Sequence, residues 1–107
     1  MALHSLKEVI AAADGVTVID VREAAELAVS GHATGALHIP LALLAMKADP
    51  KGGSYDARID PHKPVAVYCA AGGRAGMAVG TLKSLGYEAI NIGGFGEWVN
   101  AGGPVTK

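Results

Sequence analysis

Short apolar segments alternate with helical patterns along the whole chain. Residues 16–21, 36–39, 65–68 and 89–92 are mostly apolar and short, which is typical of strands buried on both faces of a sheet. Helices are predicted over residues 6–13, 23–29, 41–46, 74–85 and 95–100. Because strands and helices alternate, we expect parallel pairing with right-handed crossovers. Since 107 residues leave room for one domain only, we expect a single α/β domain over residues 1–107, with a mainly parallel sheet of four to five strands and helices on both faces.

Two segments mark where this pattern begins and where it is interrupted. Ser5-Leu6-Lys7-Glu8 matches a capping box and predicts that the first helix begins at Leu6. Residues 47–64 are polar and include Gly52-Gly53 and three prolines. This composition predicts a long surface loop with at most one helical turn. We expect the ordered part of the chain to end at residues 101–104.

Composition narrows the classes of function. Half of the residues are apolar and 18% are charged, as in a small globular domain. Nine basic and ten acidic residues leave a net charge of −1, which argues against a nucleic-acid partner. No apolar run approaches the ~20 residues of a membrane helix, and the first residues do not resemble a secretory signal. We therefore expect a soluble cytoplasmic protein without a membrane partner.

The one cysteine of the chain, Cys69, is the strongest candidate for chemistry. One cysteine excludes an intramolecular disulfide and a multi-cysteine metal site within one chain. Cys69 follows the third predicted strand, and α/β sheets place reactive sites at the carboxyl ends of their strands. A cysteine that only packs in the core is the alternative interpretation.

The residues after Cys69 favour a reactive thiolate over a packing role. They are small and precede a predicted helix: Ala70, Ala71, Gly72, Gly73. Main-chain N–H groups of such a turn can converge on one anion, and the helix start adds positive potential. Arg74 adds a full positive charge. A cysteine nucleophile requires this stabilisation of the thiolate, which would also hold an anionic substrate or a persulfide.

Four segments together resemble the rhodanese (sulfurtransferase) family, in particular its single-domain members. They are Val-Ile-Asp-Val-Arg at 18–22, the Gly-His to Ile-Pro stretch at 31–40, C-x-x-G-x-R at 69–74, and Gly-Gly-Phe-Gly-Glu-Trp at 93–98 followed by Ala-Gly-Gly-Pro at 101–104. The resemblance implies that the Cys69 thiolate takes sulfur from thiosulfate or a persulfide. The loop residues 70–74 would hold the resulting persulfide, and cyanide or a thiol would accept the sulfur. The resemblance implies no metal and no organic cofactor, but allows a protein acceptor.

Other positions refine this expectation. By analogy with the family, Asp20 and Arg22 should brace the structure near the active loop rather than take part in chemistry. Glu26 stands where two-domain, thiosulfate-preferring relatives have a cation, and Ala70 and Ala71 carry no charge. These departures favour a persulfide, polysulfide or protein donor at least as much as thiosulfate. We place none of the histidines in the mechanism: His4, His32, His38, His62.

Two alternatives to a sulfurtransferase remain open. Dual-specificity phosphatases of the cell cycle share the general fold but have five residues between cysteine and arginine, whereas this chain has four. The shorter loop suits a sulfur atom better than a tetrahedral phosphate, so a phosphatase or arsenate reductase is the lesser alternative. The other is a relay or protein-binding module without turnover, which would engage a partner through residues 47–64.

Overall fold

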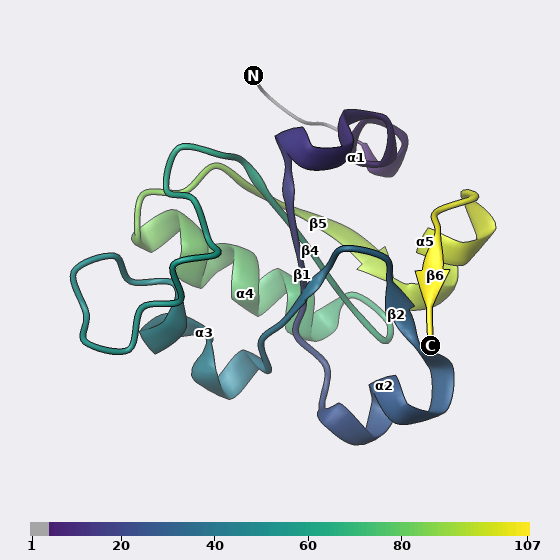
Figure 1. Cartoon of the computed structure of the whole chain (residues 1–107), viewed down its shortest axis with the longest axis horizontal. Coiled ribbons are helices and arrows are strands. Elements are labelled where there is room, and N and C mark those ends of the chain that lie inside the picture. Colours follow the sequence, from purple (N-terminus) through teal and green to yellow (C-terminus); the bar gives the residue numbers. More distant parts are fainter. Residues whose placement is uncertain (1–4) are drawn as a thin grey trace.

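The computed structural model describes residues 5–107 and contains helices and strands in alternation (Figure 1). The helices are α1 (Leu6–Ala12), the short 3-10 helix η1 (Ala13–Gly15), α2 (Ala24–Ser30), α3 (Leu41–Lys47), α4 (Gly73–Ser84) and α5 (Phe95–Asn100). The strands are β1 (Thr17–Asp20), β2 (His32–Ala33), β3 (Leu37–His38), β4 (Val65–Cys69), β5 (Ala89–Gly94) and β6 (Val105–Thr106). The capping residue at the first helix is confirmed, because Glu8 N–H donates to Ser5 Oγ at 3.3 Å.

Four strands form a parallel sheet in the order β3-β1-β4-β5. This sheet confirms the predicted α/β class with mainly parallel strands. In its register Asp20 lies opposite Tyr68, and Cys69 lies opposite Gly94. The pairing of β4 with β5 shifts between Val67 and Cys69, so β5 is locally irregular beside the end of β4. The carboxyl ends of β1, β4 and β5 therefore meet at one edge.

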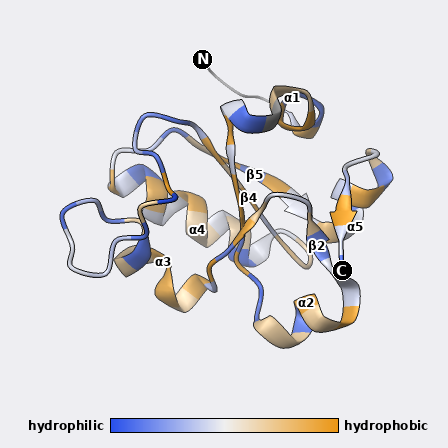
Figure 2. Ribbon diagram, in the orientation of Figure 1, coloured by the Kyte–Doolittle hydropathy of each residue, from blue (hydrophilic) through white to orange (hydrophobic). Residues whose placement is uncertain are grey.

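The two faces of β4 belong to two different parts of the core. Val65, Val67 and Cys69 pack in a cluster with residues of α3 and α4, whereas Ala66 and Tyr68 pack in a cluster with residues of α1 and α5. This alternation is the two-residue period of a strand covered on both faces. Figure 2 shows β4 mostly in hydrophobic colours and the long loop before it mostly in hydrophilic or intermediate ones.

One detail differs from the sequence-based expectation. The chain does not lose its order at residues 101–104, because β6 pairs antiparallel with β2 in a second, two-stranded sheet. Two-residue strands carry no readable alternation, so this pairing left no signal in the sequence. The predicted long loop is present over residues 48–64, where the chain forms turns and no helix. It is tied to the core by Ile59, which is fully buried.

A membrane-spanning helix requires a long and mostly apolar stretch of residues. Within residues 5–107, no helix combines the length and the apolar character that crossing a bilayer requires.

Candidate active site

Cys69 is the last residue of β4, at the carboxyl edge of the sheet. The residue is only 1% exposed, because all five residues of β4 are buried between β1 and β5. Three of the four loop residues that follow are exposed, namely Ala70, Ala71 and Gly73. A reagent that reaches the sulfur must therefore approach through this loop.

Main-chain N–H groups surround the sulfur of Cys69. The N–H of Gly72 donates to Cys69 Sγ at 2.9 Å, and the N–H of Ala75 donates at 3.4 Å. Gly72 has φ +102°, a left-handed conformation that favours glycine. The first N–H groups of α4 have no partner within the helix, so they are free to face the sulfur. We call the N–H groups of residues 71, 72, 74 and 75 the amide cradle.

Burial and the amide cradle act on the thiol in opposite directions. Burial raises the pKa of Cys69, whereas hydrogen bonds from the N–H groups of Ala75, Ala71, Gly72 and Arg74 lower it. The net effect places the pKa below the usual value of a thiol. The geometry thus favours a thiolate, which is the nucleophilic form of cysteine.

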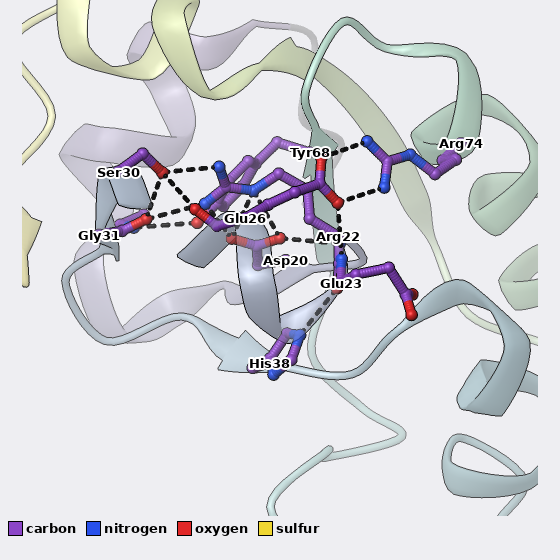
Figure 3. A network of polar contacts seen from close by, with 10 residues as sticks. Asp20, Arg22, Glu23, Glu26, Ser30, Gly31, His38, Tyr68 and Arg74 are labelled. Carbon is purple, nitrogen blue, oxygen red and sulfur yellow. Dashed lines mark hydrogen bonds and ion pairs between the residues drawn. The ribbon is translucent and has the colours of Figure 1, made fainter. Parts of the chain in front are cut away.

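Arg74 differs from the expectation that it supplies a free positive charge. Its Nη1 and Nη2 donate to the two carboxylate oxygens of Glu26 at 2.7 and 2.8 Å. This bidentate pair joins α4 to α2 beside the active loop (Figure 3). Arg74 therefore faces the sulfur through its main-chain N–H, while Glu26 neutralises its guanidinium.

Two residues of β5 support the loop and were missed by the sequence analysis. Asn91 donates through Nδ2 to the carbonyl oxygen of Gly72 at 2.9 Å and accepts from the N–H of Gly93 at 2.8 Å. Gly94 lies against the main chain of Ala70, where a Cβ atom would overlap the carbonyl oxygen. A polar residue within an otherwise apolar predicted strand was the available signal for Asn91.

Asp20 and Arg22 form a buried ion pair next to the site. Arg22 donates through Nε and Nη2 to the Asp20 carboxylate at 2.8 to 3.1 Å, and the two residues are 4% and 0% exposed. Arg22 also donates to Ser30 Oγ and to the carbonyl oxygen of Gly31, both at 2.9 Å. The pair therefore ties the end of β1 to the end of α2 (Figure 3). It contacts neighbouring elements and makes no hydrogen bond to Cys69.

Aromatic rings pack against Arg22 of this ion pair, on the face of β4 opposite to Cys69. The Arg22 guanidinium lies 4.6 Å from the ring centre of Phe95 and 5.6 Å from that of Tyr68. Tyr68 stacks on Trp98 at 6.4 Å, and its hydroxyl accepts from the N–H of Ala33 at 2.9 Å. Tyr68 and Trp98 are thus part of the buried core, and Phe95 packs against it.

One histidine, His38, has a clear structural contact. His38 Nε2 is 2.7 Å from the main-chain carbonyl oxygen of Arg22, and this hydrogen bond fixes the ring. His62 lies on the surface. His4 falls outside the described residues.

Cys69 is not among the residues that line the cavity beside α1 and the start of β1. A cavity of about 270 Å³ is lined by Val9, Ile10 and Trp98 among others, near the start of β1 and thus away from the carboxyl edge. Within residues 5–107, no three His, Cys, Asp or Glu side chains gather in a way that could hold a metal ion.

Comparison with known proteins places this geometry in a family. The family model of the rhodanese-like domain matches residues 3–101. A sulfurtransferase of Allochromatium vinosum is 29% identical over 105 residues, which cover 96% of this chain and 90% of that protein. The uncharacterized protein YqhL of Bacillus subtilis is 40% identical over 83 residues, or 76% of this chain and 59% of that protein. The chain thus spans little more than half the length of YqhL.

Solved structures agree in fold. A rhodanese-related protein of Thermoplasma volcanium is 29% identical with a TM-score of 0.78, over 99% of this chain and 98% of that one. A protein of Rhodopseudomonas palustris, described as a possible tyrosine phosphatase, is 28% identical with a TM-score of 0.84, over 99% of this chain and 85% of that one. With a family model that covers nearly its whole length and relatives of the same fold, the chain belongs to the rhodanese-like domain family.

Proposed function

We propose that the protein is a sulfurtransferase that carries sulfane sulfur as a persulfide on Cys69. The observation that carries this proposal is the amide cradle, in which main-chain N–H groups point at the sulfur of Cys69. Such a cradle stabilises negative charge first on the thiolate and then on a persulfide anion. Membership of the rhodanese-like family and the sulfurtransferase relative support the same reaction class.

In the first half-reaction the Cys69 thiolate attacks the outer sulfur of the donor. With thiosulfate, the S–S bond of the donor breaks and sulfite leaves with the bonding electron pair, so that a Cys69 persulfide anion remains. With a persulfide donor, the outer sulfur moves to Cys69 and the donor leaves as a thiolate. The amide cradle is placed to hold the charge that the transferred sulfur carries.

In the second half-reaction an acceptor takes the outer sulfur and Cys69 returns to the thiolate. Cyanide forms thiocyanate in this step, and a thiolate acceptor forms a new persulfide. No oxidant or reductant is needed, because each step exchanges one nucleophile for another at sulfur. The proposal requires no metal and no organic cofactor.

The partners in this proposal are small sulfur donors and thiol acceptors, with a protein thiol as a further acceptor. We place the reaction in the cytoplasm, where thiols are kept reduced and can serve as acceptors. Nucleic acid and membranes have no part in it.

Intact mass spectrometry tests the proposal directly. After incubation with thiosulfate or a polysulfide, we expect a gain of about 32 Da that cyanide removes. The Cys69→Ser variant should gain no sulfur under the same conditions. Failure of the wild-type protein to take up sulfur from any donor would overturn the proposal.

A relay or binding module without turnover is the rival within the same family. It predicts slow transfer from small donors and a specific protein partner at the loop of residues 47–64. A pull-down with Cys69→Ser distinguishes the two, because a partner retained without the thiol, together with no measurable transfer, favours the module.

Phosphate ester hydrolysis is the second candidate, because one relative is described as a possible tyrosine phosphatase. Two features argue against it here. Four residues separate Cys69 from Arg74, and the Arg74 guanidinium that could bind phosphate is bound to Glu26. Hydrolysis of p-nitrophenyl phosphate that is lost in Cys69→Ser would reverse this order of candidates.

A further inference from the structure

We infer that Glu26 makes the site select sulfur donors by their charge. Donors of sulfane sulfur with one negative charge or none are favoured over dianions. The inference rests on the proposed sulfur transfer and adds a specificity residue to it. Its basis is the ion pair between Glu26 and Arg74, which changes the electrostatics beside the amide cradle.

The ion pair lies at the surface, next to the turn that holds the amide cradle. Arg74 is part of the turn that carries the amide cradle, and Glu26 reaches it from α2, 48 residues earlier in the chain. The two side chains are 34% and 33% exposed, so the pair stands at the surface beside the buried sulfur. Figure 3 shows both oxygens of Glu26 turned to the guanidinium.

Both groups of the pair are charged, so their charges cancel. The hydrogen bond from Arg74 and the N–H of Glu23 hold the pKa of Glu26 at about 2, so the carboxylate stays ionised near neutral pH. The bidentate contact also occupies two of the five N–H groups of the Arg74 guanidinium, the paired set that suits a bidentate anion. The amide cradle alone then offsets the repulsion between the thiolate and an incoming anion, and this repulsion is larger for a dianion.

The surroundings of Glu26 allow its charge to be changed without disturbing the core. None of the residues of α2 is buried, and the Glu26 carboxylate also accepts from the N–H of Glu23 at 2.8 Å at the start of the helix. Glutamine at position 26 keeps the size of the side chain and an acceptor oxygen. We therefore expect Glu26→Gln to release Arg74 toward solvent and donor while α2 keeps its place.

Two donors of the same chemistry but different charge provide the probe. Thiosulfate is a dianion, and the methanethiosulfonate anion, CH3–SO2–S⁻, carries one charge. In both cases the Cys69 thiolate attacks the outer sulfur and the S–S bond breaks. The leaving group is sulfite from thiosulfate and methanesulfinate from methanethiosulfonate, and the outer sulfur remains as the Cys69 persulfide anion.

The experiment measures kcat/KM for both donors, with cyanide as acceptor, in the wild type, Glu26→Gln and Glu23→Gln. Glu23 is the matched control, because it is an exposed acidic residue of the same helix start that makes no ion pair with Arg74. For Glu26→Gln we expect the thiosulfate to methanethiosulfonate ratio to rise roughly ten-fold, and for Glu23→Gln less than about two-fold. The thiosulfate rate of Glu26→Gln should also fall more steeply with added salt. Thermal unfolding checks that each variant is folded.

Each outcome bears on the inference. A charge-dependent shift in Glu26→Gln alone supports it, since a merely structural role would slow both donors alike. An unchanged ratio in a folded Glu26→Gln that still transfers sulfur overturns the inference and leaves the proposed function intact. A shift of equal size in Glu23→Gln overturns it too. If no donor loads Cys69 in the wild type, the proposed function fails and the inference with it.

Discussion

Gly94 of β5 packs against the main chain of Ala70, the first residue after Cys69, so closely that no side chain fits between them. The register explains this approach, because Gly94 is paired with Cys69 at the irregular end of β5. The shape of the active loop therefore depends on the neighbouring strand as well as on the loop's own glycines. Loop shape matters for chemistry, because displacement of the N–H groups by about 1 Å is enough to slow a reaction strongly.

Gly94→Ala should therefore impair sulfur uptake. A Cβ atom would overlap the Ala70 carbonyl oxygen, which is main chain and must move with the loop. We expect the rate of persulfide formation on Cys69 to fall by more than about ten-fold, with about 1–3 kcal/mol of stability lost to overpacking. Intact mass at timed intervals and urea unfolding measure the two effects.

Gly96→Ala is the matched control for this change. Gly96 lies two residues further on, in α5, and nothing approaches the place of its Cβ within 4 Å. Alanine should raise stability by about 0.5–1 kcal/mol and leave sulfur uptake as in the wild type. Equal losses of activity in the two variants would contradict the role assigned to Gly94.

Asn91 should support the loop through hydrogen bonds rather than through packing. Asn91→Ala removes its bond to the Gly72 carbonyl and frees the N–H of Gly93. Because Gly72 supplies the shortest N–H contact to Cys69, we expect roughly a ten-fold slower persulfide formation and about 1 kcal/mol lower stability. Asn100→Ala, at the exposed end of α5, is the control. A normal rate in Asn91→Ala would show that the loop holds its shape without this bond.

The surroundings of Cys69 could be predicted from the sequence, whereas the contact of Asn91 with the loop could not. The apolar run before Cys69 and the small residues after it predicted the strand, the turn and the helix that form the site, because each depends on local preferences. The supporting contact of Asn91 depends on the neighbouring strand and its irregular register. Local patterns do not encode such a register.

The partner of Arg74 was missed for a similar reason. Glu26 and Arg74 were both singled out in the sequence, but their 48-residue separation gave no indication that they meet. The antiparallel pairing of β2 with β6 was also beyond local patterns, because two residues are too few to show alternation. In contrast, the class of the fold and the order of most elements followed from periodicity alone.

The buried pair of Asp20 and Arg22 should be essential for stability. Arg22→Met would leave the fully buried Asp20 carboxylate without its partner, and we expect a loss of about 3–5 kcal/mol in the free energy of unfolding. Urea unfolding followed by circular dichroism measures this loss. The double variant Asp20→Asn/Arg22→Met should recover part of it, because it buries no unpaired charge.

Asp56 and Arg58 offer a control with the same sequence spacing. Arg58 donates through Nε and Nη2 to the Asp56 carboxylate, as Arg22 does to Asp20, but its side chain is 63% exposed. Solvent screens this pair, so Arg58→Met should change stability by no more than about 1 kcal/mol. Similar losses in the two Arg→Met variants would mean that burial does not set the importance of the Asp20–Arg22 pair.

The pH dependence of Cys69 alkylation separates the amide cradle from the side chain of Arg74. Because the amide cradle outweighs burial and lowers the thiol pKa, alkylation by iodoacetamide should reach half its maximal rate below the usual pH of about 8.5. Arg74→Ala removes a positive charge and leaves the Glu26 carboxylate unpaired. A nearby negative charge disfavours the thiolate, so the midpoint of this variant should move to higher pH.

The double variant Arg74→Ala/Glu26→Gln decides which groups hold the thiolate. It removes both charges of the pair but keeps every main-chain N–H around the sulfur. If the amide cradle is the main source of the lowered pKa of Cys69, the alkylation midpoint of the double variant should return most of the way to the wild-type value. A midpoint that stays as high as in Arg74→Ala would assign the effect to the guanidinium, and the amide cradle would then be too weak to stabilise a persulfide anion on its own.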